Sequence, residues 1–89
     1  MKEIEVLIKN KYGLHARPSS LLANTAGEYK SEIRIVKEEK EVNVKSIMSL
    51  LLLAAGEGTK LKVIAEGEDE DAALEAIRVL IEDRKFDEE

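Results

Sequence analysis

Residues 3–29, EIEVLIKNKYGLHARPSSLLANTAGEY, contain a change of hydrophobic period that decides the first half of the fold. Over residues 3–8, apolar and charged side chains alternate, which is typical of a strand with one buried face. Gly13 suits a sharp turn after this strand. From residue 16 to residue 29, apolar side chains recur every three or four positions, which predicts a helix. Pro18 fits its first turn, where an amide hydrogen would have no partner.

The rest of the chain shows the same two periods in shorter segments. Alternation predicts further strands at residues 32–35, 41–44 and 61–65. Apolar clusters predict two more helices, one that begins after Ser46 and one that begins after Asp69. Both residues have side chains that can accept a hydrogen bond from a free amide of the first helical turn, so we expect them to be N-caps.

The resulting order is βαββαβα, which predicts an α+β fold. We expect an open-faced sandwich, with a four-stranded antiparallel sheet and the helices packed on one face. At 89 residues, the chain is long enough for a single domain that spans residues 1–89. The other sheet face is expected to stay in water, and it would carry Glu3, Glu5, Glu32, Arg34, Lys60 and Lys62. We expect the acidic residues 87–89 to form a frayed tail.

Composition excludes several classes of function. The chain has 19 acidic and 14 basic side chains and only three aromatic ones, which argues against binding to nucleic acid. It has no cysteine and one histidine, so we expect neither a metal site nor a disulfide, and no cofactor. The apolar run at residues 47–55 is too short to cross a bilayer, and residues 1–11 do not resemble a signal peptide. We therefore expect a cytoplasmic protein.

The segment at residues 13–18, GLHARP, could carry chemistry. His15 would stand at the start of the first helix, where free amides and the helix dipole attract an anion. Arg17 would add a fixed cation. The same positive field disfavours the imidazolium, so the ring should be neutral and nucleophilic. From spacing alone, however, a lone histidine at a helix start is more often an ordinary cap or surface residue.

Two motifs together change this balance. The residues Gly13-Leu14-His15-Ala16-Arg17-Pro18 and Lys45-Ser46-Ile47-Met48 resemble HPr, the histidine-containing phosphocarrier family of the bacterial phosphoenolpyruvate-dependent sugar phosphotransferase system. The resemblance extends over nearly the whole chain in length, element order and motif positions. It implies a carrier rather than an enzyme. Enzyme I would phosphorylate His15 at Nδ1, Ala16 and Arg17 would hold the phosphate, and an enzyme IIA domain would accept it.

The resemblance also implies a second phosphorylation site and a docking surface. Ser46 would be phosphorylated by HPr kinase/phosphorylase, after which the protein would bind a transcription regulator. Four consecutive leucines cannot all be buried by one short helix, so some should be exposed. We expect a monomer whose partners dock on Tyr12, Ser20, Leu21, Lys45, Ile47, Met48 and Leu51. Tyr12 could also stack near the imidazole, or it could only shield the end of the first strand.

Two other functions remain open at this stage. The first is a regulatory paralogue that acts mainly through phosphorylation of Ser46 and protein binding. The resemblance argues against it, because paralogues of that kind lack the active histidine and His15 is present. The second is a metabolite-binding domain without covalent chemistry. Such a domain would need a concave site with convergent polar groups, and the sequence offers no such cluster away from His15.

Overall fold

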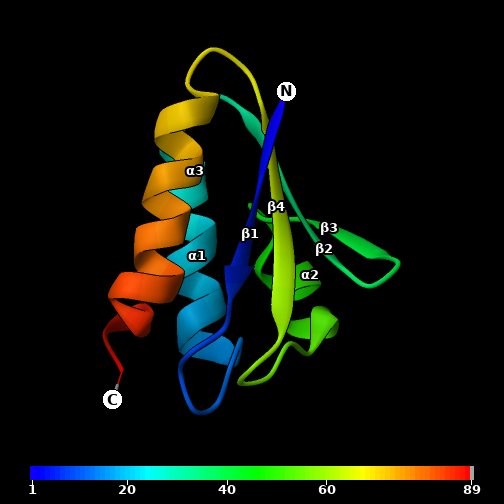
Figure 1. Ribbon diagram of the computed structural model, residues 1–89, viewed down its shortest axis with the longest axis vertical. Helices are drawn as coiled ribbons and strands as arrows, with labels where there is room; N and C mark the ends of the chain where they lie inside the picture. Colours follow the sequence, from blue (N-terminus) through cyan, green and yellow to red (C-terminus); the bar gives the residue numbers. More distant parts are fainter. Residues whose placement is uncertain (89) are drawn as a thin grey trace.

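The computed structural model describes residues 1–88 and has the predicted order of elements (Figure 1). The strands are β1 (Lys2–Leu7), β2 (Glu32–Lys37), β3 (Lys40–Asn43) and β4 (Lys60–Glu66). The helices are α1 (Ala16–Gly27), α2 (Ile47–Leu53) and α3 (Glu70–Arg78). Helix α3 continues into a π-helical turn, η1 (Val79–Asp83), and a 3-10 turn, η2 (Lys85–Asp87). Helix α1 ends at Gly27, and Tyr29, the last residue of the predicted apolar stripe, packs against the core from the following loop.

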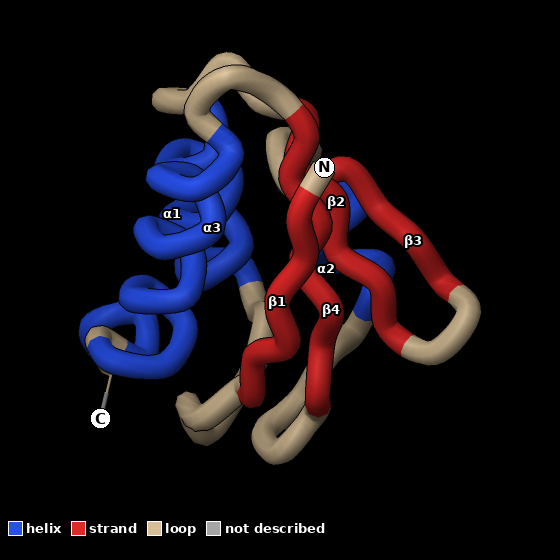
Figure 2. The backbone as a smooth tube through the Cα atoms, turned by 45° about the horizontal axis from the view of Figure 1, so that its top comes forward, coloured by secondary structure: helices blue, strands red, loops and turns tan. Residues whose placement is uncertain are grey.

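The strands form one four-stranded sheet in the order β1-β4-β2-β3, and all neighbours are antiparallel. Figures 1 and 2 show α1 and α3 side by side on one face of this sheet. Helix α2 contacts both α1 and β3. The α+β open-faced sandwich predicted from the sequence is therefore confirmed.

The core lies between the sheet and the helices and is almost entirely aliphatic. Its strand residues follow the predicted alternation, and those that are buried include Val6, Ile33, Ile35, Leu61, Val63 and Ala65. Burial of each large aliphatic side chain stabilises the fold by about 1.5–3 kcal/mol. The opposite face carries the predicted charged residues, and Lys62 and Glu3 form an ion pair across it at 3.3 Å. None of the helices in residues 1–88 combines the length and apolar character needed to span a membrane.

Ser46 and Asp69 are the N-cap residues of α2 and α3, but only Ser46 makes a capping hydrogen bond with its side chain. Ser46 Oγ accepts a hydrogen bond from the amide of Ser49 at 3.3 Å, as predicted. Asp69 occupies the predicted N-cap position of α3, and its carbonyl oxygen accepts a hydrogen bond from the amide of Ala73 at 2.9 Å, but its side chain makes no capping hydrogen bond. Its carboxylate accepts hydrogen bonds from the Ser31 hydroxyl at 2.5 Å and from the amides of Ser31 at 3.0 Å and Lys30 at 2.8 Å. These bonds, led by the one from the Ser31 hydroxyl, lower the pKa of Asp69. Asp69 therefore joins the loop after α1 to the start of α3.

The predicted frayed tail at residues 87–89 is also wrong over its described part; Glu89 lies outside the described residues. Phe86 is completely buried in the core. Lys85, Phe86 and Asp87 have φ values of 50°, 56° and 59°, in the left-handed region. Burial of the aromatic ring supplies the free energy that holds this unusual turn. The turn brings the C-terminal segment, residues 84–88, back toward the start of α1.

Candidate functional site

A tightly packed turn positions His15 at the start of α1. Gly13 has φ 64°, and a Cβ atom there would lie 2.2 Å from the carbonyl oxygen of Ala55. Only glycine fits this turn without strain. The amide of Leu14 donates to the same carbonyl oxygen at 2.9 Å, and Leu14 is buried. The turn therefore fixes the backbone directly before His15, whose side chain is 41% exposed.

The first turn of α1 has amides that are available to an anion. The first helical hydrogen bond runs from the amide of Ser19 to the carbonyl oxygen of His15 at 3.0 Å. Within residues 1–88, the amides of Ala16 and Arg17 donate to no protein acceptor. Together with the helix dipole, they give this end of α1 a positive potential next to the imidazole.

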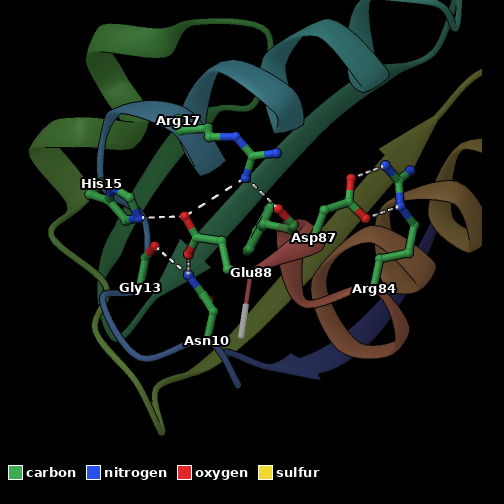
Figure 3. Close-up of polar contacts among 8 residues, drawn as sticks. Asn10, Gly13, His15, Arg17, Arg84, Asp87 and Glu88 are labelled. Carbon is green, nitrogen blue, oxygen red and sulfur yellow. Dashed lines mark hydrogen bonds and ion pairs between the residues drawn. The ribbon is translucent and has the colours of Figure 1, made fainter.

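A carboxylate lies between the His15 ring and the Arg17 guanidinium (Figure 3). Glu88 Oε2 is 2.9 Å from His15 Nε2 and 3.8 Å from Arg17 Nη1. Glu88 Oε1 accepts a hydrogen bond from Asn10 Nδ2 at 2.9 Å. Asn10 is buried, and its Nδ2 also donates to the carbonyl oxygen of Gly13 at 2.8 Å. The arrangement shows that an anionic group fits between the His15 imidazole and the Arg17 guanidinium.

Arg17 and Tyr12 flank this site from two directions. Arg17 Nη1 donates to the carbonyl oxygen of Phe86 at 2.8 Å, which holds the guanidinium beside the C-terminal segment. The ring of Tyr12 meets the imidazole edge to face, with centroids 6.0 Å apart and an interplanar angle of 84°. Tyr12 therefore lies near the imidazole, as one of the two alternatives predicts, but in an edge contact rather than a parallel stack.

The residues predicted as a docking surface differ in exposure. Ile47 and Met48 are exposed as predicted, and Leu52, rather than the predicted Leu51, is the exposed leucine of α2, at 74%. Leu51 is half-buried, as are Ser20 and Leu21, whereas Lys45 and Tyr12 are exposed. Because Leu50 and Leu53 point into the core from α2, residues on the opposite side of this helix face water. We call Ile47, Met48 and Leu52 the apolar patch.

Sequence reasoning missed Asn10 and Glu88. They lie 78 positions apart, so no local pattern connects them. The only available signal was Phe86, an aromatic residue just before the acidic end of the chain. A residue of that size is usually buried, so the chain around it had to return to the core.

Comparison with known proteins identifies the family. A family model described as the PTS HPr component phosphorylation site matches residues 2–83. The chain belongs to the HPr family. An HPr from Thermoanaerobacter tengcongensis has a solved structure that superimposes with a TM-score of 0.95, at 47% identity, and the match covers 100% of this chain and 99% of that one.

Two further HPr-family proteins show the range of names among similar chains. The HPr-like protein Crh of Halalkalibacterium halodurans is 48% identical over 82 residues, which cover 92% of this chain and 98% of that protein. A structure described as an HPr dimer from Thermoanaerobacter tengcongensis matches with a TM-score of 0.75 and 46% identity, over 96% of this chain and 98% of that one. The chain is thus an HPr-family phosphocarrier protein, a carrier rather than a catalyst.

Proposed function

We propose that this HPr-family protein accepts a phosphoryl group on His15 from enzyme I and passes it to an enzyme IIA domain of the sugar phosphotransferase system. The observation that supports this most is the carboxylate of Glu88, which lies between the His15 imidazole and Arg17 at the open start of α1. The free amides of Ala16 and Arg17 at the same helix start favour a further anion, the phosphoryl group. The exposure of His15 suits a group that must reach two protein partners in turn.

The transfer needs a nucleophile and a place for negative charge. A lone pair of the His15 ring, on Nδ1 by analogy with the family, forms the N–P bond. The bond between phosphorus and the donor breaks, and its electron pair stays with the donor. The amides of Ala16 and Arg17 and the Arg17 guanidinium then face the negative charge of the phosphoryl oxygens. Because Arg17 is 54% exposed, it can exchange its contact with the C-terminal segment for one with phosphate.

Partner binding is assigned to the surface that joins the apolar patch to Tyr12, Ser20, Leu21, Lys45 and Leu51. Met48 is 66% exposed, and a flexible apolar side chain suits a surface that accepts several partners. The protein is proposed to act in the cytoplasm as a monomer. Size-exclusion chromatography with light scattering tests the oligomeric state, since a relative has been described as a dimer.

Ser46 is proposed as a regulatory phosphorylation site for HPr kinase/phosphorylase, with a transcription regulator as the partner of the modified protein. A phosphate at the start of a helix is electrostatically favourable. The alternative is a regulatory paralogue that acts mainly through Ser46, and the similarity to a Bacillus subtilis protein described as Crh, the catabolite repression HPr, supports it. The presence of His15 and Arg17 together at the start of α1 favours the carrier.

One experiment separates these functions. The protein is incubated with phosphoenolpyruvate and enzyme I, and the acid-labile phosphate bound to it is measured. We expect labelling of the parent and of Ser46→Ala, no labelling of His15→Ala, and loss of label when an enzyme IIA domain is added. With ATP and the kinase instead, we expect acid-stable phosphate that Ser46→Ala lacks. A regulatory paralogue would give only the second result, and labelling of His15→Ala by enzyme I would overturn the carrier.

A further inference from the structure

The side-chain carboxylate of Glu88 makes a directional contact with one nitrogen of the His15 ring. Glu88 Oε2 lies 2.9 Å from Nε2, which is hydrogen-bond distance. An ionised carboxylate can only accept hydrogen bonds, so Nε2 must be the donor. In a neutral imidazole, the other nitrogen then carries the lone pair. Within residues 1–88, Nδ1 has no hydrogen-bond partner, so that lone pair is free to react.

Glu88 is held in this position by several groups. Its side chain is only 18% exposed, although it stands one residue from the end of the chain. The buried Asn10 amide donates to Oε1, and the backbone amide of Glu88 donates to the carbonyl oxygen of Lys85 at 3.0 Å. Arg17 lies 3.8 Å from Oε2 and balances its charge. These contacts fix the direction from which the carboxylate meets the imidazole.

The backbone before Glu88 is strained in a way that serves this contact. Three successive residues, 85–87, are non-glycine residues in the left-handed region, where an L-residue is disfavoured. The turn persists because Phe86 is buried, because Arg17 binds the Phe86 carbonyl oxygen, and because Arg84 pairs with Asp87 at 2.6 Å. A strained turn that the surrounding structure maintains is found more often at functional sites than elsewhere.

We propose that Glu88 is a positioning residue for His15. Its carboxylate keeps the neutral ring in the Nε2–H tautomer and so leaves Nδ1 as the nucleophilic nitrogen. The inference rests on the proposed phosphotransfer and adds to it the group that selects the reacting atom. The logic is that of a catalytic triad, in which a carboxylate orients a histidine through the nitrogen that does not react.

The proton and charge balance of the step follows from this geometry. When Nδ1 forms the bond to phosphorus, the proton stays on Nε2, and the ring acquires positive charge. The electron pair of the broken bond remains with the donor. The Glu88 carboxylate faces that positive charge and stabilises it through the hydrogen bond. When the phosphoryl group leaves, the electron pair of the N–P bond returns to Nδ1, and the ring is again neutral with its proton on Nε2.

The first test reads the tautomer directly and needs no partner protein. Long-range proton–nitrogen correlation spectra of 15N-labelled protein, taken where the ring is neutral, identify which nitrogen carries the proton. We expect the Nε2–H form to dominate in the parent and in Glu39→Ala, which removes an exposed carboxylate of the β2–β3 turn. In Glu88→Ala, we expect the two nitrogen shifts to move toward each other as the Nδ1–H form becomes populated. Unchanged shifts in this variant would overturn the proposal.

The second test measures transfer. With limiting enzyme I, we expect Glu88→Ala to accept phosphate about tenfold more slowly than the parent, the effect of one lost hydrogen bond to a charged group. Glu88→Gln, which keeps the shape and loses the charge, should fall between the two, and thermal unfolding verifies that both variants are folded. A rate equal to that of the parent would overturn the proposal, because the carboxylate would then have no effect on transfer. A higher rate would overturn it too, because the carboxylate would then compete with the phosphoryl group. If the parent itself is not phosphorylated, the proposed function fails, while the spectra still decide the role of Glu88.

Discussion

Replacement of Phe86 by alanine tests whether the C-terminal segment is an integral part of the fold. Phe86 is completely buried and is the one phenylalanine of the chain. Truncation of a buried phenylalanine costs about 3–5 kcal/mol of folding free energy. The left-handed turn can relax in part once the ring is gone, and this relaxation offsets some of the cost. We therefore expect a net loss near the lower limit, about 3 kcal/mol.

Such a loss is large for a domain of this length. At about 0.05–0.15 kcal/mol per residue, the free energy of unfolding should be about 4–13 kcal/mol. An unfolding entropy of about 2.1 cal/mol/K per residue converts a loss of 3 kcal/mol into a fall in Tm of about 16 °C. Circular dichroism during heating measures this shift. Tyr12→Ala is the matched control, since that aromatic ring is exposed and its loss should change stability by no more than about 0.5 kcal/mol. If Phe86→Ala lost less than about 1 kcal/mol, the claim that this ring anchors the segment would be refuted.

Three further predictions concern single positions elsewhere in the fold. Ser46→Ala should lose about 1 kcal/mol of stability, because the helix loses its N-cap, and denaturant unfolding with an unchanged m-value checks this. Gly13→Ala should lose at least about 2 kcal/mol of stability, because the new Cβ atom would meet the carbonyl oxygen of Ala55 and because φ at this position is positive. Gly27→Ala is the control, since the space around Gly27 is open, and it should be neutral or stabilising. Asp69 has a lowered pKa, so its contribution to stability is complete above its unfolded pKa of about 3.9 and is lost as the pH falls through the lower folded value. The urea midpoint of unfolding should therefore fall less between pH 7 and pH 3 in Asp69→Asn than in the parent. An equal fall in the two proteins would contradict this reading.

The sheet and helices could be predicted because each depends on a local pattern. Alternation over residues 3–8 and the three-to-four spacing after Ala16 follow directly from strand and helix geometry. The Ser46 cap is equally local, since its partner, the Ser49 amide, lies three residues ahead. Even the exposure of part of the leucine run followed from the width of a helix face. The choice between Leu51 and Leu52 depended on which residues of α2 meet the core, and this is a tertiary property.

The errors come from contacts between distant parts of the chain. Asp69 has the side chain and position of an N-cap, but the amides of the loop after α1 compete for its carboxylate across 38 and 39 positions. The acidic C-terminal residues look like a solvated tail, because nothing near them shows that Asn10 and His15 will bind Glu88. His15 and Arg17 could be proposed as a site because both stand in one short motif. The carboxylate that completes their surroundings could not.

The location of the phosphoryl group tests the account most directly. The protein is phosphorylated with enzyme I and phosphoenolpyruvate, kept at neutral pH, digested, and sequenced by tandem mass spectrometry with a fragmentation method that preserves bonds between nitrogen and phosphorus. We expect the phosphoryl group on His15 alone, and its disappearance when an enzyme IIA domain is added before digestion. A phosphoryl group on any other residue, or one that an enzyme IIA domain does not remove, would contradict the proposal that the start of α1 is a phosphotransfer site.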